Sequence, residues 1–274
     1  MLTDAHCHPC DLLFVFPESE QERANILSHN GAAGVIAAVS AWNENEFAYN
    51  EELSRNGSVL LCFGTHPQLP SIYSEKGRLF KDSDLSASME FLYKSAEKNK
   101  IAAIGEFGFD LFNDSFKETE KIQDKIFEAH LEAALNYELP VVLHIRRAMH
   151  KMFFYAKKLS KCKAVIFHSW SGSHEEALSL LKHGVNAYFS FGNTITLNHK
   201  QAMRSCSLLP SQRLLTETDA PFQPRRGEKF SHWTDILNIL ETAAALRSEA
   251  GNNIDVKELE LQIEINFKNL FSLN

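Results

Sequence analysis

Short apolar runs recur along the chain, and each is followed by a longer amphipathic or charged stretch. The runs are rich in Val, Ile, Leu and Phe, which is typical of strands buried in a parallel sheet. The intervening stretches are long enough for a crossover helix and too long for a hairpin, which favours parallel pairing. The predicted strands cover residues 2–4, 35–39, 59–63, 101–105, 141–143, 164–167, 187–189 and 214–216.

The stretches between the runs have the period of amphipathic helices. Strand–helix units repeated over 274 residues predict a (β/α)8 TIM barrel, whose typical length is about 250 residues. No linker or composition break interrupts the repeat, so we expect one α/β domain over residues 1–274; an open, doubly wound sheet is the alternative. The predicted helices cover residues 18–30, 44–56, 85–99, 116–137, 148–159, 174–183, 197–205, 232–250 and 256–271.

The composition is that of a globular protein. Hydrophobic residues make up 44% and charged residues 23% of the chain, which excludes intrinsic disorder. Lys and Arg number 28 against 35 Asp and Glu, and the net charge of −7 argues against non-specific coating of nucleic acid. A polyanionic substrate would need a local patch of positive charge.

The chain has no apolar run approaching the roughly 20 residues of a membrane span, and it opens without the basic and apolar regions of a signal peptide. Its cysteines are odd in number and mostly scattered, unlike a secreted disulfide framework. We expect a cytoplasmic, membrane-independent enzyme with reduced cysteines. These are Cys7, Cys10, Cys62, Cys162 and Cys206.

Five predicted strands end in a histidine or an acidic residue, where ordinary loop residues would be expected. In a (β/α)8 barrel the carboxyl ends of the strands form the active-site face, so these side chains would converge on one mouth. The set consists of His6, His8, Glu106, His144, His168 and Asp219.

Strand alternation supports this convergence, because side chains at i and i+2 point to the same face. His6 and His8 share that parity, so both can point inward. The same rule adds His66, Arg146 and Glu217 to the mouth.

Imidazoles and carboxylates form a mixed nitrogen and oxygen ligand set, which suits Zn, Mn, Fe or Ni and, with more water, Mg. One ion needs only three or four of these ligands, so six predict two ions bridged by the Glu106 carboxylate. Two ions about 3.5 to 4 Å apart would clamp the attacking and leaving oxygens of an in-line displacement. The pattern therefore predicts hydrolysis.

Each residue also has an ordinary interpretation. A lone strand-end histidine such as His66 is more often a surface or hydrogen-bonded residue, and an isolated Asp such as Asp219 commonly caps the next helix. These ordinary interpretations do not explain the whole set, because burying so many unpaired polar groups would cost several kcal/mol.

In chain order, the strand ends resemble the signatures of the TatD-type metal-dependent deoxyribonucleases of the amidohydrolase superfamily. The resemblance extends over nearly the whole chain. It rests on Asp4-Ala5-His6-Cys7-His8, Gly64-Thr65-His66-Pro67, Gly105-Glu106-Phe107-Gly108-Phe109-Asp110, Leu143-His144-Ile145-Arg146, His168-Ser169-Trp170-Ser171-Gly172-Ser173 and Thr216-Glu217-Thr218-Asp219-Ala220-Pro221-Phe222.

The resemblance implies that the six strand-end residues are the ligands of a two-metal site, with Glu106 bridging. It also implies hydrolysis of DNA phosphodiester bonds, often from the 3′ end, with Mg, Mn or Zn. The chain departs from the family pattern at Phe107, Phe109 and Trp170 and in the loop 223–232, which bears on the choice of substrate.

Two groups of basic residues follow the fifth and eighth strands and would rim the mouth. We expect His66, Arg146, Arg225 and Arg226 to contact phosphoryl oxygens, although exposed loop arginines are common. Such a small positive focus suits a few nucleotides at a single-stranded or frayed end of DNA. The two groups are Arg146, Arg147 and Lys151, and Arg225, Arg226 and Lys229.

Aromatic residues near the mouth could stack on unpaired bases. Packing between barrel and helices is the stronger interpretation for most of them, since the chain contains 20 Phe. The candidates are Phe107, Phe112, Trp170, Phe222 and Trp42.

For the mechanism, we expect Asp219 and Glu106 to be catalytic. Asp219 would orient and deprotonate the attacking water, and Glu217 would fix a ligand histidine from one layer deeper. We expect a monomer without an obligate protein partner.

Three alternatives remain open. A small-molecule amidohydrolase, lactonase or phosphotriesterase would use the same ligands, although such relatives often have a bridging carbamylated lysine, for which no Lys is placed here. Cys7 and Cys10 form a C-x-x-C motif, but a redox pair would open a helix in a much smaller domain. A non-catalytic, metal-stabilised scaffold explains an open hydrolytic site poorly.

Overall fold

In the computed structural model, which describes residues 1–10, 35–56 and 58–273, eight parallel strands form one sheet. Each strand pairs with the next one along the chain. The strands are β1 Leu2–Cys7, β2 Val35–Ala41, β3 Val59–Phe63, β4 Ala103–Asp110, β5 Val141–Arg146, β6 Val165–Phe167, β7 Ala187–Phe191 and β8 Leu214–Thr216.

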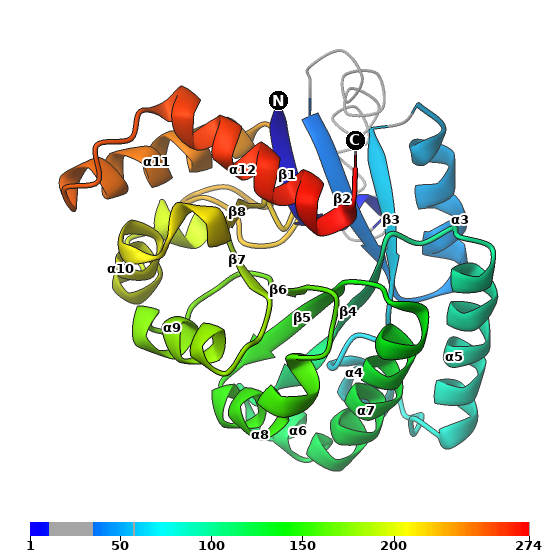
Figure 1. The fold of residues 1–274 in the computed structure, drawn as a ribbon. Coiled ribbons are helices and arrows are strands. Elements are labelled where there is room, and N and C mark those ends of the chain that lie inside the picture. The colour runs from blue at the N-terminus through cyan, green and yellow to red at the C-terminus, as the bar shows by residue number, and fades with distance from the viewer. Residues whose placement is uncertain (11–34, 57, 274) are drawn as a thin grey trace.

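The last strand lies beside the first. The Thr216 hydroxyl donates to the Thr3 carbonyl at 3.0 Å, and further along, the N–H of His8 donates to the Ala220 carbonyl at 2.8 Å. The sheet therefore closes into a barrel with helices around it, as Figure 1 shows. This confirms the predicted single-domain (β/α)8 fold and excludes the open, doubly wound sheet.

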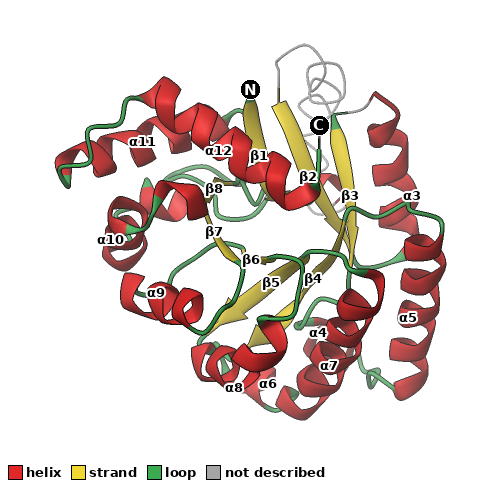
Figure 2. Ribbon diagram, viewed as in Figure 1, coloured by secondary structure: helices red, strands yellow, loops and turns green. Residues whose placement is uncertain are grey.

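The helices that connect the strands agree with the predicted segments to within a few residues (Figure 2). The predicted segment 116–137 divides into two helices, and one short helix was not predicted; the predicted helix 18–30 lies outside the described residues. The helices are α3 Glu44–Leu53, α4 Leu69–Glu75, α5 Asp82–Glu97, α6 Asp114–Lys117, α7 Glu120–Tyr137, α8 Met149–Leu159, α9 His174–Lys182, α10 Lys200–Leu208, α11 Asp235–Glu249 and α12 Val256–Phe271. Among the described residues, no helix is both long and apolar enough to cross a membrane.

The C-terminal helix closes the end of the barrel at which the strands begin. Phe267 and Phe271 of α12 belong to the same buried cluster as the small strand residues Ala5 and Ala103. Asn266 donates to the carbonyl of Leu214, the first residue of β8, at 2.8 Å. The opposite end of the barrel is left for polar side chains.

Two strands are irregular where they approach the polar end. Between Asp4 and Cys7, β1 has one residue more than its partner β2, and β4 has one residue more than β5 between Ile104 and Phe107. Such bulges turn a side chain away from strict alternation. The irregular segments are Ala5 and His6 in β1 and Gly105 and Glu106 in β4.

Glycine is required next to this bulge in β4. A Cβ at Gly108 would lie 2.0 Å from the His144 carbonyl oxygen, and the Gly108 φ of +152° disfavours any side chain. The close approach of β4 to β5 therefore depends on the absence of a side chain here.

We expect Gly108→Ala to lower the free energy of unfolding by about 3 kcal/mol or more, because backbone atoms must move to accept the methyl group. Urea unfolding followed by circular dichroism measures this loss. Gly77→Ala is the control, since Gly77 also has a positive φ, of +72°, but no atom lies within 4 Å of the added Cβ; it should cost about 1 kcal/mol. Equal losses in the two variants would contradict the steric explanation.

Candidate metal centre

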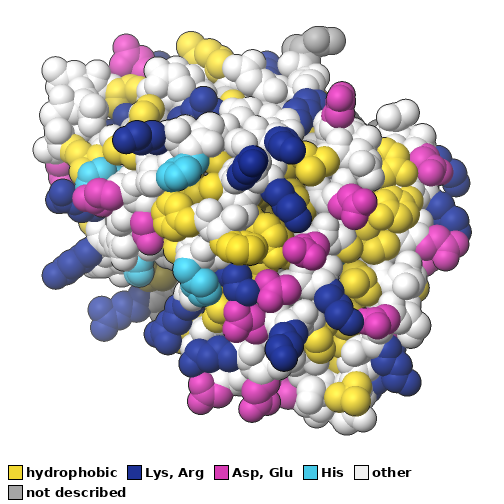
Figure 3. All heavy atoms as spheres, turned by 60° about the horizontal axis from the view of Figure 1, so that its bottom comes forward, with side chains coloured by type: hydrophobic (Ala, Val, Ile, Leu, Met, Phe, Trp, Pro, Cys, Tyr) yellow, Lys and Arg dark blue, Asp and Glu magenta, His cyan; other side chains and the backbone are white. Residues whose placement is uncertain are grey.

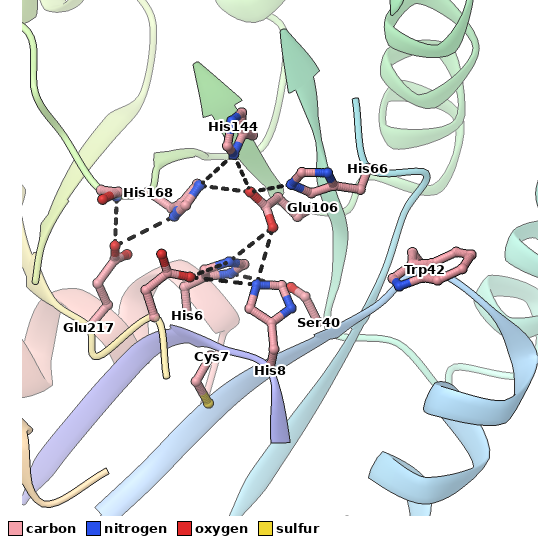
Figure 4. Close-up of polar contacts among 12 residues, drawn as sticks. His6, Cys7, His8, Ser40, Trp42, His66, Glu106, His144, His168 and Glu217 are labelled. Carbon is pink, nitrogen blue, oxygen red and sulfur yellow. Dashed lines mark hydrogen bonds and ion pairs between the residues drawn. The ribbon is translucent and has the colours of Figure 1, made fainter. Parts of the chain in front are cut away.

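The carboxylate of Glu106 lies at the centre of the polar end, surrounded by five histidines from four other strands or the loops that follow them (Figure 4). Its Oε2 faces the first strand, at 3.2 Å from His6 Nε2 and 3.3 Å from His8 Nε2. Its Oε1 faces the opposite way: the contacts are 2.7 Å to His144 Nδ1, 2.7 Å to His168 Nε2 and 3.4 Å to His66 Nε2. The two oxygens of one carboxylate thus serve two separate groups of imidazoles.

Asp219 adds a second carboxylate on the side of the first strand. Its Oδ1 lies 3.6 Å from both His6 Nε2 and His8 Nε2. Its Oδ2 accepts a hydrogen bond from the Gln223 side chain at 2.6 Å, and the same amide contacts the Ser169 hydroxyl. The structure therefore brings all six strand-end residues of the sequence analysis into one cluster.

The charges around the buried Glu106 carboxylate favour its ionised form. Burial would raise the pKa of Glu106, but His168, His66 and His6 hold it well below its usual range. Burial would lower the pKa of His168, but Glu106 and Glu217 hold it well above the ordinary value. Ionised groups that are this deeply buried need opposite charges within direct reach.

The donor atoms fit a divalent cation. His6 Nε2 and Glu106 Oε2 face each other at 3.2 Å, yet neither has a hydrogen-bond partner among the described residues. Such orphaned buried atoms call for a ligand between them. Within the part of the chain that the structure describes, three groups have donor atoms close enough to hold an ion: His6, His8 and Glu106; His6, His168 and Asp219; and His66, Glu106 and His144.

Glu217, expected to fix a ligand histidine, lies on the outer side of His168. Its Oε1 accepts a hydrogen bond from the Ser169 N–H at 2.7 Å and lies 3.5 Å from His168 Nδ1. A carboxylate in this place favours a proton on Nδ1 of His168 and leaves Nε2 as the free donor atom.

Sequence analysis missed a further buried carboxylate of the cluster, that of Asp110. Its Oδ2 lies 3.1 Å from His144 Nε2 and accepts from the Gln68 side chain at 2.7 Å. Asp110 is the last residue of β4, four residues after Glu106, so strand alternation could have placed it on the same side. The predicted strand ended at Gly105, because the apolar run ends there, whereas the hydrogen-bonded strand continues.

Asp4 and Ser40 are further supporting residues that were not assigned. Asp4 accepts from the Thr218 N–H at 3.0 Å and from its hydroxyl at 2.6 Å, and burial raises the pKa of Asp4 to about 7. The Ser40 hydroxyl lies 3.3 Å from His6 Nδ1. Both connect β1 to its neighbours in the barrel and hold His6 in place.

Several loop residues at the mouth have left-handed backbone conformations. Arg147, Ser169, Asp219 and Gln223 have φ values of 54°, 49°, 53° and 56°. Such a conformation costs about 1 kcal/mol or more for a residue with a side chain. These four residues lie at or just after strand ends near the polar cluster, whereas other residues with positive φ, such as Asn99 and Glu138, lie elsewhere.

The predicted substrate-contacting arginines differ in their surroundings. The Arg146 guanidinium lies 3.6 Å from the centre of the Phe112 ring and 3.9 Å from the buried Asp110 Oδ2, and its side chain is 47% exposed. Arg225 forms a closer ion pair, at 2.6 Å, with the buried Asp235 at the start of α11, and its side chain is 39% exposed. Arg226 is exposed.

Two aromatic candidates for base stacking are packing residues. Phe107 is fully buried, and Trp170, 3% exposed, packs against Phe189 with ring centres 4.7 Å apart. The packing interpretation therefore holds for both, and neither ring is open to a base. Phe112 and Phe222 remain exposed, and the Phe222 ring lies edge-on to His8 at 5.4 Å.

A parallel eight-stranded barrel with histidines and carboxylates at the carboxyl ends of its strands defines a metal-dependent hydrolase of the amidohydrolase superfamily. The chain matches the TatD related DNase family over residues 3–272 and belongs to that family.

The chain is similar to relatives and to a solved structure over much of its length. It is 33% identical to the uncharacterized metal-dependent hydrolase YjjV of Escherichia coli K12 over 82% of this chain and 81% of that protein. It is 33% identical to the 3′-5′ ssDNA/RNA exonuclease TatD of Erwinia tasmaniensis over 66% of this chain and 70% of that one. The crystal structure of E. coli YjjV superimposes with a TM-score of 0.81 at 26% identity, covering 100% and 98% of the two chains.

A buried histidine outside the cluster holds the loop that carries His66. His130 Nε2 accepts from the Thr65 N–H at 3.0 Å, and its Nδ1 lies 2.8 Å from the Ile126 carbonyl oxygen. Burial lowers the pKa of His130 to about 4, so the folded protein keeps this ring neutral. The unfolded chain, with a pKa near 6.5, takes up the proton first as the pH falls.

We therefore expect His130 to make the folded state less stable as the pH falls from about 6.5 to 4, by up to ~1.4 kcal/mol per pH unit and about 3 kcal/mol in total. Urea unfolding at several pH values should show a shallower decline in His130→Leu than in the wild type. The exposed His183 is the control, and His183→Gln should retain the wild-type slope. A His130→Leu slope identical to the wild type would contradict the neutral, buried ring.

Proposed function

We propose that this protein is a two-metal deoxyribonuclease that removes nucleotides from the 3′ end of single-stranded or frayed DNA. The observation that carries the proposal is the division of the Glu106 carboxylate between two groups of imidazoles. One ion would be held by His6, His8, Asp219 and Glu106 Oε2, and the other by His144, His168 and Glu106 Oε1.

Two divalent ions bound there supply Lewis acidity for a phosphoryl oxygen and lower the pKa of an attacking water. The protein's own residues then handle the proton and the orientation. Gln223 engages Asp219 Oδ2, which leaves Oδ1 directed at the centre as the atom that accepts the proton. Glu217 and Asp110 hold His168 and His144 in the orientation that a metal ligand needs.

DNA as the substrate is supported by relatives and by the cations at the mouth. The TatD exonucleases of Erwinia tasmaniensis and Erwinia amylovora are 33% and 31% identical to this chain. The Arg146 guanidinium, held over Phe112 and half exposed, is placed to bind a phosphate.

We expect the substrate site to contact only a few nucleotides. A cavity of about 400 Å³ lies beside His168 and Ser169, a volume typical of small-ligand sites. On the face drawn in Figure 3, Lys and Arg side chains are interspersed with Asp and Glu. With a net charge of −7, this favours a few nucleotides at a strand end over a long duplex.

The same charge and cavity favour one other candidate, a hydrolase of small amides, lactones or phosphotriesters. The activated water can attack carbon or phosphorus, so the ligand set does not distinguish the two. The physiological ion among Mg, Mn and Zn, the monomeric state and the cytoplasmic location remain predictions.

The first test uses metal-stripped protein resupplied with Mg, Mn or Zn and a single-stranded DNA labelled at its 5′ end. We expect a metal-dependent ladder that shortens from the 3′ end with time, and no products in the presence of a chelator. Two bound ions per chain without cleavage under any metal would contradict the nuclease and favour the small-molecule hydrolase.

The second test removes the proposed proton acceptor. We expect Asp219→Ala to lower kcat on that DNA about 10²–10⁴-fold, because the water loses its base and one ion loses a ligand. Circular dichroism should show a retained fold. Asp114→Ala is the matched control, since Asp114 is an exposed carboxylate paired with Lys117, and it should keep wild-type turnover. Near wild-type activity of Asp219→Ala would refute the assignment.

A further inference from the structure

Two histidines face the same oxygen of Glu106, yet their outer ring nitrogens have opposite kinds of partner. His66 Nε2 lies 3.4 Å and His144 Nδ1 lies 2.7 Å from Glu106 Oε1. On the far side, the main-chain N–H of Gln68 donates to His66 Nδ1 at 3.3 Å. The outer nitrogen of His144 is Nε2, which lies 3.1 Å from the carboxylate of Asp110.

These partners decide where each ring carries its proton. A main-chain N–H can only donate, so His66 Nδ1 must offer a lone pair, and the proton of the neutral ring sits on Nε2. An ionised carboxylate can only accept, so His144 keeps its proton on Nε2 and offers the lone pair of Nδ1 to the centre. The ring of His66 therefore presents an N–H to the mouth, and the ring of His144 presents a free lone pair.

A metal ligand needs the lone pair, and an N–H cannot bind a cation. His66 belongs to one of the groups whose donor atoms are close enough to hold an ion, together with Glu106 and His144. Distance alone would make it a ligand. The hydrogen bond from the Gln68 N–H places the ring proton of His66 on Nε2, so this nitrogen donates a hydrogen bond and does not bind a metal ion.

We infer that His66 is a hydrogen-bond donor to the substrate and not a ligand of a metal ion, and that Gln68 is the positioning residue that imposes this role. The acceptor is a non-bridging oxygen of a phosphodiester or an equivalent oxyanion; its identity rests on the proposed function. An N–H aimed at the place where negative charge develops stabilises the transition state more than the ground state.

The loop that carries His66 is held on both sides. The Gln68 side chain donates to Asp110 Oδ2 at 2.7 Å, so the carboxylate that orients His144 also anchors the loop of His66. On the other side of His66, the Thr65 N–H donates to His130 at 3.0 Å. One buried carboxylate, Asp110, thus links the two histidines whose roles differ.

Nuclear magnetic resonance of histidine-¹⁵N-labelled, Zn- or Mg-loaded protein tests the proton position directly. We expect the Nε2 of His66 to resonate as a protonated ring nitrogen and its Nδ1 as an unprotonated one, with the opposite role for Nδ1 of His144 as a metal-bound atom. The spectrum of His66→Gln assigns the His66 signals by their loss. A proton on Nδ1 of His66, or a metal-shifted Nε2, would overturn the inference.

Metal content separates donor from ligand without reference to activity. His66→Leu and His66→Gln should bind two ions per chain with affinities within about threefold of the wild type, whereas His144→Leu should lose or greatly weaken one ion. Thermal unfolding checks that each variant is folded. Loss of an ion in His66→Leu comparable to that in His144→Leu would refute the donor role.

Kinetics complete the test on the substrate that the wild-type protein hydrolyses. We expect His66→Leu to lower kcat about 10²–10³-fold, as loss of one transition-state donor does, and His66→Gln to recover part of it, because its amide restores an N–H. A wild-type protein that cleaves no DNA would contradict the proposed function alone, because the resonance and metal-content results decide the His66 role independently.

Discussion

The mouth of the barrel depends on one buried carboxylate, that of Glu106. It is 3% exposed and carries a negative charge because the surrounding imidazoles outweigh the effect of burial on its pKa. A buried charge persists only where opposite charges or strong donors are in direct contact. His168, His66, His6 and His144 all favour the ionised state of this one side chain, and the same arrangement leaves donor atoms facing a common centre.

Several backbone irregularities lie where the strands approach that carboxylate. Extra residues in β1 and β4 turn His6 and Glu106 inward, and Ser169 and Asp219 adopt left-handed conformations at the ends of β6 and β8. Such local costs persist when the rest of the structure over-determines them. Here the stability comes from the apolar end closed by α12 and from the buried layer between helices and strands. One end of the barrel therefore stabilises the fold, and the other end holds the polar cluster.

The sequence predicts some features of this site and not others. Apolar runs and strand alternation predicted the barrel and the ligand-type residues, because both depend on local periodicity that a single chain displays. They did not predict Asp110, Gln68 or Gln223. The contacts of Asp110 with His144, of Gln68 with Asp110 and of Gln223 with Ser169 join loops and strands far apart in sequence, whereas Gln68 to His66 and Gln223 to Asp219 are local contacts. The predicted end of the fourth strand at Gly105 was too early for a related reason: a polar residue can continue a strand when its neighbour supplies the hydrogen bonds.

The residues that select a substrate are harder to predict than those that perform the chemistry. Arg146 ends β5 and Arg225 lies in the loop after β8, and each faces a buried carboxylate. The guanidinium of Arg225 contacts Asp235 directly at 2.6 Å, whereas that of Arg146 lies 3.9 Å from Asp110 and packs over the ring of Phe112. An arginine in direct contact with a buried carboxylate stabilises the fold and is not available to a substrate, because its release would leave the buried charge without a partner.

A guanidinium that packs over an aromatic ring and is half exposed has lost some conformational freedom and still has N–H groups open to solvent. It therefore loses little further freedom when it binds two oxygens of a phosphate. A neutral amide or lactone has no anionic oxygens that could pair with this guanidinium. This difference favours a phosphodiester over a small neutral substrate at a mouth whose ligand set would serve either one.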